Sequence, residues 1–242
     1  MSLTLEILLI CLLSIFQSIF GVGLLLFGTP LFLYFDYGFS ETLSSLLPAS
    51  ISISFMQYFF SKNKDLNYIK DFNIFCIPFL GAFLYLVVFY EKIIDFKYWV
   101  SIILIISSLI TINSKHFLSL SKTIYKFRKL LLMFIGTVHG ISNMGGSFLS
   151  IFSSSISNDN KFLTRQYISY GYLSMGVIQY LVLVIFYTSN LSFNKFFYIF
   201  LSILVYFPSQ TIFNFIIYDI YVKIISVVAM LFGILILMSY YI

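Results

Sequence analysis

Apolar stretches long enough to cross a membrane follow one another along almost the whole chain, and short polar segments separate them. A membrane-spanning helix needs about 20 mainly apolar residues. By this criterion the sequence predicts an all-α integral membrane protein with about eight transmembrane helices. The predicted spans are residues 3–20, 42–60, 72–89, 98–112, 130–152, 162–187, 196–218 and 222–242.

Two glycine-rich breaks interrupt this pattern, one near the start of each hydrophobic half. The first runs from Gln17 through Gly21 and Gly23 to Pro30, and the second runs from His139 to Ser147. Interrupted hydrophobic segments at corresponding positions of two halves point to the binding site of a transporter.

The breaks divide the chain into two related halves. Sliding one half over the other aligns Gln17 with His139, Gly21 with Asn143 and Gly23 with Gly145. We therefore predict two four-helix repeats, residues 1–113 and 130–242, each containing a Gly-rich broken or re-entrant helix. A basic cytoplasmic connector, residues 114–129, joins them.

The composition agrees with the membrane assignment and argues against several other classes of protein. Hydrophobic residues make up 60% of the chain and charged residues only 10%, whereas soluble domains carry roughly 25% charged residues. The net charge of +5 comes from basic residues that lie between apolar stretches, so we predict no nucleic-acid partner. Cys11 and Cys76 both fall in apolar segments, which indicates neither a disulfide framework nor a metal site.

Basic residues in short loops predict the orientation of a membrane protein. Counting them favours cytoplasmic N- and C-termini in a multi-pass protein of the cell (inner) membrane. The count depends on residues 21–35, which either cross the bilayer or return as a re-entrant hairpin. An even number of crossings per half gives parallel repeats and an odd number gives inverted ones, and the sequence leaves both open.

The breaks suit the binding of a small anion. Helix N-termini carry free N–H groups and a positive dipole end, and glycine lets a ligand approach the backbone. We expect two half-helices to hold one anion between the repeats. The candidate substrate-binding residues are Gln17, Gly21, Gly23, Gly28, Pro30, His139, Asn143, Gly145, Gly146, Ser147 and Arg165.

Purely structural interpretations of the same residues stay open. Glycine and serine also permit close helix packing in membranes. Arg165 could act as an interfacial anchor whose charge reaches the headgroups. His139 could equally form a structural hydrogen bond between helices.

At these residues the chain resembles the TauE/SafE sulfite exporter family, whose repeat carries a glycine-rich run followed by an apolar stretch and proline. Gly136-Thr137-Val138-His139-Gly140 and Asn143-Met144-Gly145-Gly146-Ser147 carry the resemblance in the second half. Gly21-Val22-Gly23 and Gly28-Thr29-Pro30 carry it in the first half, which lacks the triple glycine. The resemblance implies transport of small sulfur-containing anions such as sulfite or a sulfonate.

Energetics favour export of such an anion. Moving one negative charge out of an inside-negative cell gains about 2.3 kcal/mol per 100 mV, so potential-driven export needs no coupling ion. The alternative is proton- or sodium-coupled uptake, for which Asp36, Glu41 and His139 are the coupling candidates.

Two further function classes compete with a transporter. The sequence lacks the nucleophile and metal motifs of membrane enzymes, so we predict a protein that is not an enzyme and needs no cofactor. A non-transporting subunit of a membrane complex is the other alternative. The predicted partners are the anion and the lipid bilayer, and a homo-oligomer is left open.

Overall fold

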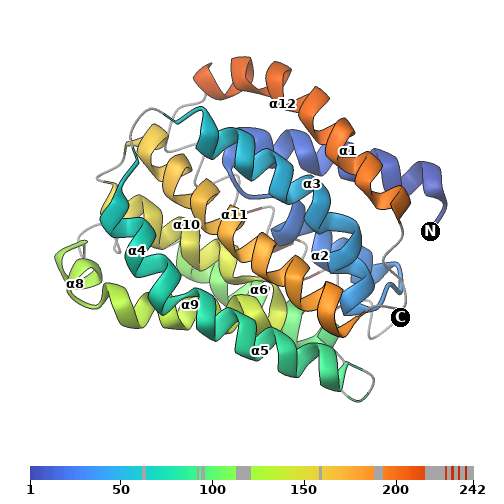
Figure 1. Cartoon of the computed structure of the whole chain (residues 1–242), viewed down its shortest axis with the longest axis horizontal. Coiled ribbons are helices and arrows are strands. Elements are labelled where there is room, and N and C mark those ends of the chain that lie inside the picture. The colour runs from blue at the N-terminus through green and yellow to red at the C-terminus, as the bar shows by residue number, and fades with distance from the viewer. Residues whose placement is uncertain are drawn as a thin grey trace.

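A computed structural model describes residues 1–61, 64–91, 93, 96–112, 121–157, 160–187 and 193–215, together with 227, 230, 231, 234 and 238. This part of the chain is helical and contains no strand, as predicted (Figure 1). The helices are α1 (Leu3–Phe20), α2 (Leu24–Tyr34), α3 (Phe39–Phe59), α4 (Leu66–Phe75), α5 (Ile77–Tyr90), α6 (Phe96–Ile112), α8 (Ser121–Lys126), α9 (Arg128–Ser142), α10 (Gly145–Ile156), α11 (Lys161–Phe186), the 3₁₀ helix η2 (Phe193–Phe196) and α12 (Phe197–Phe215).

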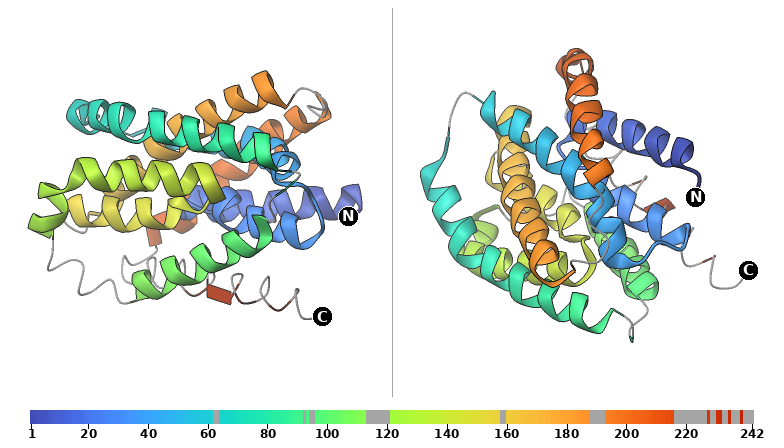
Figure 2. Two further views of the ribbon diagram at one scale, coloured as in Figure 1. Left: turned by 90° about the horizontal axis from the view of Figure 1, so that it is seen from below. Right: turned by 45° about the vertical axis from the view of Figure 1, so that its right-hand side comes forward.

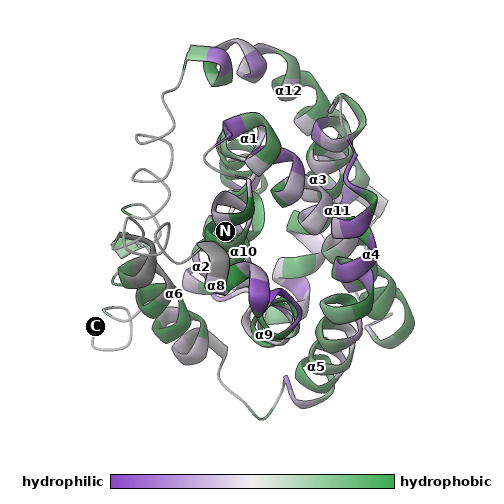
Figure 3. Cartoon of the chain, turned by 90° about the vertical axis from the view of Figure 1, so that its left-hand side faces the viewer, coloured by the Kyte–Doolittle hydropathy of each residue, from purple (hydrophilic) through white to green (hydrophobic). Residues whose placement is uncertain are grey.

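Four helical segments of the described chain are long and apolar enough to cross a membrane. They are Leu3–Phe20, Leu66–Tyr90, Lys161–Phe186 and Phe197–Phe215. Many large apolar side chains are exposed, for example Phe89 at 67% and Phe215 at 82%. Hydrophobic residues run along most of the helices (Figure 3). Lipid is the solvent that suits such a surface, so the structure is compatible with the predicted membrane protein.

The first glycine break is the turn of a helical hairpin. Gly21 ends α1 in the left-handed conformation, at φ 76°, and its N–H donates to the Gln17 carbonyl. Glycine adopts this conformation without a Cβ clash. Gly23 then packs on the backbone of Leu13 and Gln17, so α2 runs back along α1 until Tyr37 donates a hydrogen bond to Glu6. The first hairpin, made of α1 and α2, therefore begins and ends at the same end of the bundle.

The second break forms a second hairpin, which corrects the predicted single span over residues 130–152. Asn143 ends α9 at φ 62°, and α10 returns beside α9 (Figure 2), with the Phe134 and Phe148 ring centroids 5.2 Å apart. Leu132 from α9 and Ile156 from α10 line one cavity at the common end of the two arms. Glycine at 145 permits the reversal because it lies directly against His139 and Ile135.

Helices α3 and α11 pack antiparallel in the centre of the bundle. The ring centroids of Tyr58 and Tyr170 lie 5.1 Å apart, and Gly176 packs on Ile51 and Leu47. Hairpins and central helices run along a common direction, so the bundle has two opposite ends (Figure 1).

The two ends differ in charge, and we name them accordingly. At the basic end Arg128 pairs with Asp71 at 2.8 Å, and Lys161 donates to the Asn214 carbonyl. The other residues there include Lys64, Lys126, Lys129 and Arg165, which lie near the ends of helices that meet at this end.

At the acidic end Glu91 accepts hydrogen bonds from the Ser40 N–H and hydroxyl. Burial, followed by the charge of Glu6, raises the pKa of Tyr37 to about 12, so this tyrosine stays protonated and donates to Glu6. Lys195 donates to the Ser44 hydroxyl, and burial lowers its pKa. Most of the predicted final span and residues 114–120 of the predicted connector lie outside the described residues.

Close packing of α9 on α5 gives the first test. An alanine Cβ at Gly136 would lie 2.2 Å from the Cys76 carbonyl oxygen, whereas one at Gly81 would make only an ordinary 3.7 Å contact with Ile178. Overpacking costs about 1–3 kcal/mol, so Gly136→Ala should lower the unfolding temperature in detergent. Gly81→Ala, the matched control, should leave it unchanged or raise it because alanine favours helix. Equal unfolding temperatures for the two variants would contradict the α5–α9 packing.

Candidate functional site

The backbone groups at the first hairpin turn are satisfied by buried amide side chains. The Gln17 Oε1 accepts from the Leu24 N–H at 3.1 Å and thereby caps the start of α2. The Gln17 Nε2 donates to the Ser50 and Ser54 hydroxyls on α3. The Gln57 Nε2, also on α3, donates to the Gln17 and Ser18 carbonyls at the end of α1. The Gln17 amide thus finds its partners within the protein, whereas the Gln57 Oε1 is buried without a hydrogen-bond partner.

The second hairpin turn is held by a different set of side chains. The Asn143 Nδ2 donates to the Thr29 hydroxyl of α2 at 2.6 Å, which joins the two hairpins. The Asn143 Oδ1 accepts from the Gln179 Nε2 of α11 at 3.1 Å. All three polar side chains are fully buried.

His139 stands at the position in the second hairpin that Gln17 occupies in the first, but it lacks the same partners. Its side chain is fully buried, and neither Nδ1 nor Nε2 has a hydrogen-bond partner. Gln179 lies close enough to interact with the ring, yet its Oε1 is also buried without a hydrogen bond. A buried polar atom without a partner costs free energy that a bound ligand can recover.

Tyr172 covers the start of α10 beside His139. The two ring centroids lie 6.0 Å apart and the rings meet edge to face. A Cβ at Gly146 would lie 1.6 Å from the Tyr172 hydroxyl oxygen, so only glycine fits under this side chain. No side-chain hydrogen bond from the cap residue closes the start of α10. The Ser147 N–H donates to the Met144 carbonyl at 3.4 Å, and the N–H groups of Gly145 and Gly146 before it belong to the first turn, which has no partner within a helix.

The two hairpin turns lie at different levels along α11. Gly21 packs on Ile168, and Asn143 accepts from Gln179. These α11 residues are about 16 Å apart along the helix axis, and Tyr172 lies between them. The structure therefore does not bring the N-termini of α2 and α10 to one point, as the sequence analysis expected.

The remaining predicted residues fall into three groups. Gly28 and Pro30 are buried within α2, where Gly28 packs on Leu46. The Ser147 hydroxyl donates to the Met144 carbonyl of its own turn. Arg165 lies beside Gly21 at the first hairpin turn. It donates a hydrogen bond to Gln210, and its guanidinium lies 3.6 Å from the Phe213 ring centroid.

The carboxylates predicted as coupling candidates lie away from both turns. Asp36 is exposed and Glu41 is half-buried, and both lie at the acidic end, beside the start of α3. Among the coupling candidates, only His139 lies in the interior of the described bundle.

Sequence reasoning missed three residues of these networks: Gln57, Gln179 and Tyr172. A signal was present, because the spacing that aligns Gln17 with His139 also aligns Gln57 with Gln179. Tyr172 gave no such signal, since one tyrosine among 19 in an apolar chain does not stand out.

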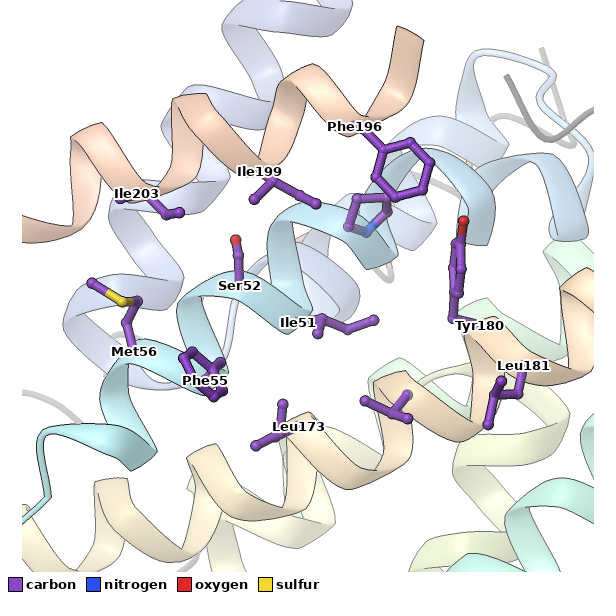
Figure 4. Close-up of a pocket in the computed structure, with 12 residues that line it drawn as sticks. Ile51, Ser52, Phe55, Met56, Leu173, Tyr180, Leu181, Phe196, Ile199 and Ile203 are labelled. Carbon is purple, nitrogen blue, oxygen red and sulfur yellow. The ribbon is translucent and has the colours of Figure 1, made fainter. Parts of the chain in front are cut away.

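Two cavities open elsewhere on the described bundle. A cavity of about 370 Å³ at the basic end is lined by polar residues such as Asp65, Asp71, Arg128 and Tyr167. A larger groove of about 560 Å³ lies between α3, α11 and α12, and its lining includes Ile51, Phe55 and Leu181 (Figure 4). The groove is too apolar to bind an anion.

Comparisons of the chain with protein families, with curated proteins and with solved structures find no match. The functional interpretation therefore depends on the geometry of the two hairpins.

Asn143 provides a test of the second turn. Asn143→Ala would lose the bonds to Thr29 and Gln179 and would place alanine at a positive φ, at a combined cost of about 2–4 kcal/mol. Asn143→Gly would lose the same bonds without the backbone strain. We expect unfolding temperatures in detergent in the order wild type, Asn143→Gly, Asn143→Ala. Wild-type stability of both variants would contradict the hydrogen bonds described here.

Proposed function

We propose that this protein is a membrane carrier for small anions, and that it moves sulfur-containing anions such as sulfite or a sulfonate. The observation that carries the proposal is the uncapped start of α10 beside the buried, unpartnered His139. Helix N-termini attract anions, and broken helices at the centre of a bundle form the sites of many transporters. The sulfur chemistry rests on the resemblance to the TauE/SafE family alone.

Matched helix boundaries support the proposal that two repeats build the carrier. The pairs Phe20 and Ser142, Tyr34 and Ile156, and Phe39 and Lys161 begin or end corresponding helices, and each pair is 122 positions apart. Gln57 and Gln179 have the same separation, and each donates to the hairpin turn of its own half.

The hairpins start from opposite ends of the bundle, which favours inverted rather than parallel repeats. We infer that each half combines one re-entrant hairpin with three crossings. The predicted spans 3–20 and 130–152 then belong to hairpins, and the helices α3, α4–α5, α6, α11 and α12 cross the membrane.

This arrangement changes the proposed orientation in the cell membrane. Seven basic residues lie near the basic end, namely Lys64, Lys70, Lys126, Arg128, Lys129, Lys161 and Arg165. Lys195 lies at the acidic end, as does the first turn of α6, which contains Lys97. Cytoplasmic segments carry the excess of lysine and arginine, so we infer that the basic end faces the cytoplasm. The N-terminus, at the acidic end, then lies outside the cell, opposite to the sequence-based prediction.

Thiol labelling tests the orientation. In a chain with Cys11→Ser and Cys76→Ser, a membrane-impermeant maleimide should label Ser2→Cys in intact cells. It should label Lys126→Cys only after the membrane is opened. The reverse pattern would show that the acidic end faces the cytoplasm.

Anion flux into proteoliposomes tests the function. Sulfite, thiosulfate, methanesulfonate and chloride are compared under an imposed membrane potential or an imposed pH gradient. We expect saturable flux of a sulfur anion by the wild-type protein. Gly146→Ala, which must displace Tyr172, should lower that flux roughly tenfold or more.

Gly81→Ala is the matched control, because its Cβ makes only an ordinary 3.7 Å contact with Ile178, and it should transport normally. Absence of flux for every anion under both gradients would reject the carrier. Normal flux in Gly146→Ala would place the transport path away from α10 and would favour a merely structural role for the break.

A further inference from the structure

His139 is surrounded by neutral groups on every helix packed against α9. Helix α11 contributes Tyr172 and Gln179, and α10 contributes Gly145. The Cys76 thiol lies on the adjoining end of α5, one turn before the level of Gly140. Between Trp99 and Ile112, α6 holds no titratable side chain.

Charged groups approach α9 only at its distant start. There α4 provides Asp71, which pairs with Arg128, eleven positions or about 16 Å before His139 along the axis. The lysines Lys126 of α8 and Lys129 of α9 lie at this basic end too. In the described part of the chain, Glu6 and His139 are the only buried side chains among Asp, Glu, Lys, Arg and His, and Glu6 is at the acidic end.

The two halves differ most at this position. Gln17 satisfies the start of α2 and two serine hydroxyls with its own amide, so the first hairpin needs no further charge. The matching His139 offers two nitrogens without partners, next to an uncapped helix start. A protonated imidazole has two N–H donors. One of them suits the unpartnered Gln179 Oε1, and the other remains for a ligand at α10.

We propose that His139 takes up one proton together with one monovalent anion, so that the protein is a proton-coupled carrier of monoanions. This inference rests on the proposed function. The anion binds between His139 and the first N–H groups of α10, in space that the Tyr172 side chain occupies in the structure. The imidazole holds the proton while the anion is bound and releases it when the anion leaves.

Charge balance explains why proton and anion bind together. An isolated charge in a buried, apolar site costs several kcal/mol, whereas a pair of opposite charges costs much less. The described interior offers one titratable cation, His139, and no lysine or arginine. A second negative charge on the ligand would therefore have no partner, which selects monoanions over dianions.

Coupling also sets the direction of transport. One proton and one monoanion moving together carry no net charge, so the membrane potential does not act on the cycle. An inward proton gradient then drives uptake, which reverses the potential-driven export favoured by the sequence.

Methanesulfonate is the probe that tests this proposal. It stays a monoanion at every pH of the experiment, so any coupled proton must travel on the protein. With the potential held at zero and the outside one pH unit more acidic, the wild-type protein should accumulate it about tenfold. An inside-negative potential of about 60 mV, worth a tenfold effect on an uncoupled monoanion, should have no effect on this accumulation.

His139→Gln places the residue of the first hairpin in the second, which preserves size and hydrogen-bonding capacity. We expect the variant to fold, and we expect its accumulation driven by the pH gradient to fall to about onefold. Any flux that remains should become sensitive to potential. His116→Gln, which alters the only other histidine of the chain, should behave like the wild-type protein.

The outcomes separate the two proposals. Methanesulfonate flux that follows potential but not pH, with His139→Gln unchanged, would overturn the coupling and leave the carrier intact. Transport of thiosulfate, a dianion, without transport of methanesulfonate would overturn the selection for monoanions. No flux of any anion under either gradient would reject the carrier itself, and the coupling with it.

Discussion

Where a helix is interrupted inside an apolar bundle, its unpaired backbone N–H and C=O groups must find other hydrogen-bond partners. This structure depends on that constraint. In hydrocarbon, each unpaired backbone group costs several kcal/mol, so a broken helix survives only where protein groups replace the missing partners. The first hairpin meets this requirement with Gln17 and Gln57. The second uses Asn143, Thr29 and Gln179 to hold its turn. Four buried amide side chains, Gln17, Gln57, Asn143 and Gln179, lie where the helices are interrupted.

The same constraint explains the size of the residues around the turns. Each hairpin returns along its own first arm, and α9 also packs closely on α5, so the backbones approach at Gly23, Gly136 and Gly145. Small residues permit such close approach in membranes, where no hydrophobic force drives helices together. The glycines that suggested a binding site thus have a packing role at most positions. At Gly146 the neighbour is the Tyr172 hydroxyl, whereas at Gly23 and Gly136 it is backbone.

Much of the fold could be predicted from the sequence because hydrophobicity and glycine spacing encode it directly. The helical class, the end of α1 at Phe20 and the turns at Gly21 and Asn143 follow from local pattern. The return of α10 along α9 does not follow from local pattern. An apolar helix of 12 residues has the same sequence pattern whether it continues the preceding helix or folds back along it. That single ambiguity determines how many times the chain crosses the bilayer. It therefore also determines which end of the bundle the basic residues assign to the cytoplasm.

The candidate site was less predictable, because it depends on which buried polar groups have no hydrogen-bond partner. The spacing of Gln17 and His139 identified corresponding positions, but a sequence does not reveal that one side chain is saturated and the other is not. Under the proposed two-repeat arrangement, the first turn serves as an internal reference for the second. Both are buried, and both receive a glutamine donor from the neighbouring long helix. The difference between them is that a neutral amide caps one helix start, while a titratable ring lies beside the other. A helix start that the protein caps itself stabilises the fold, and one without a cap favours a ligand that brings the missing charge, which is why we place anion binding in the second half.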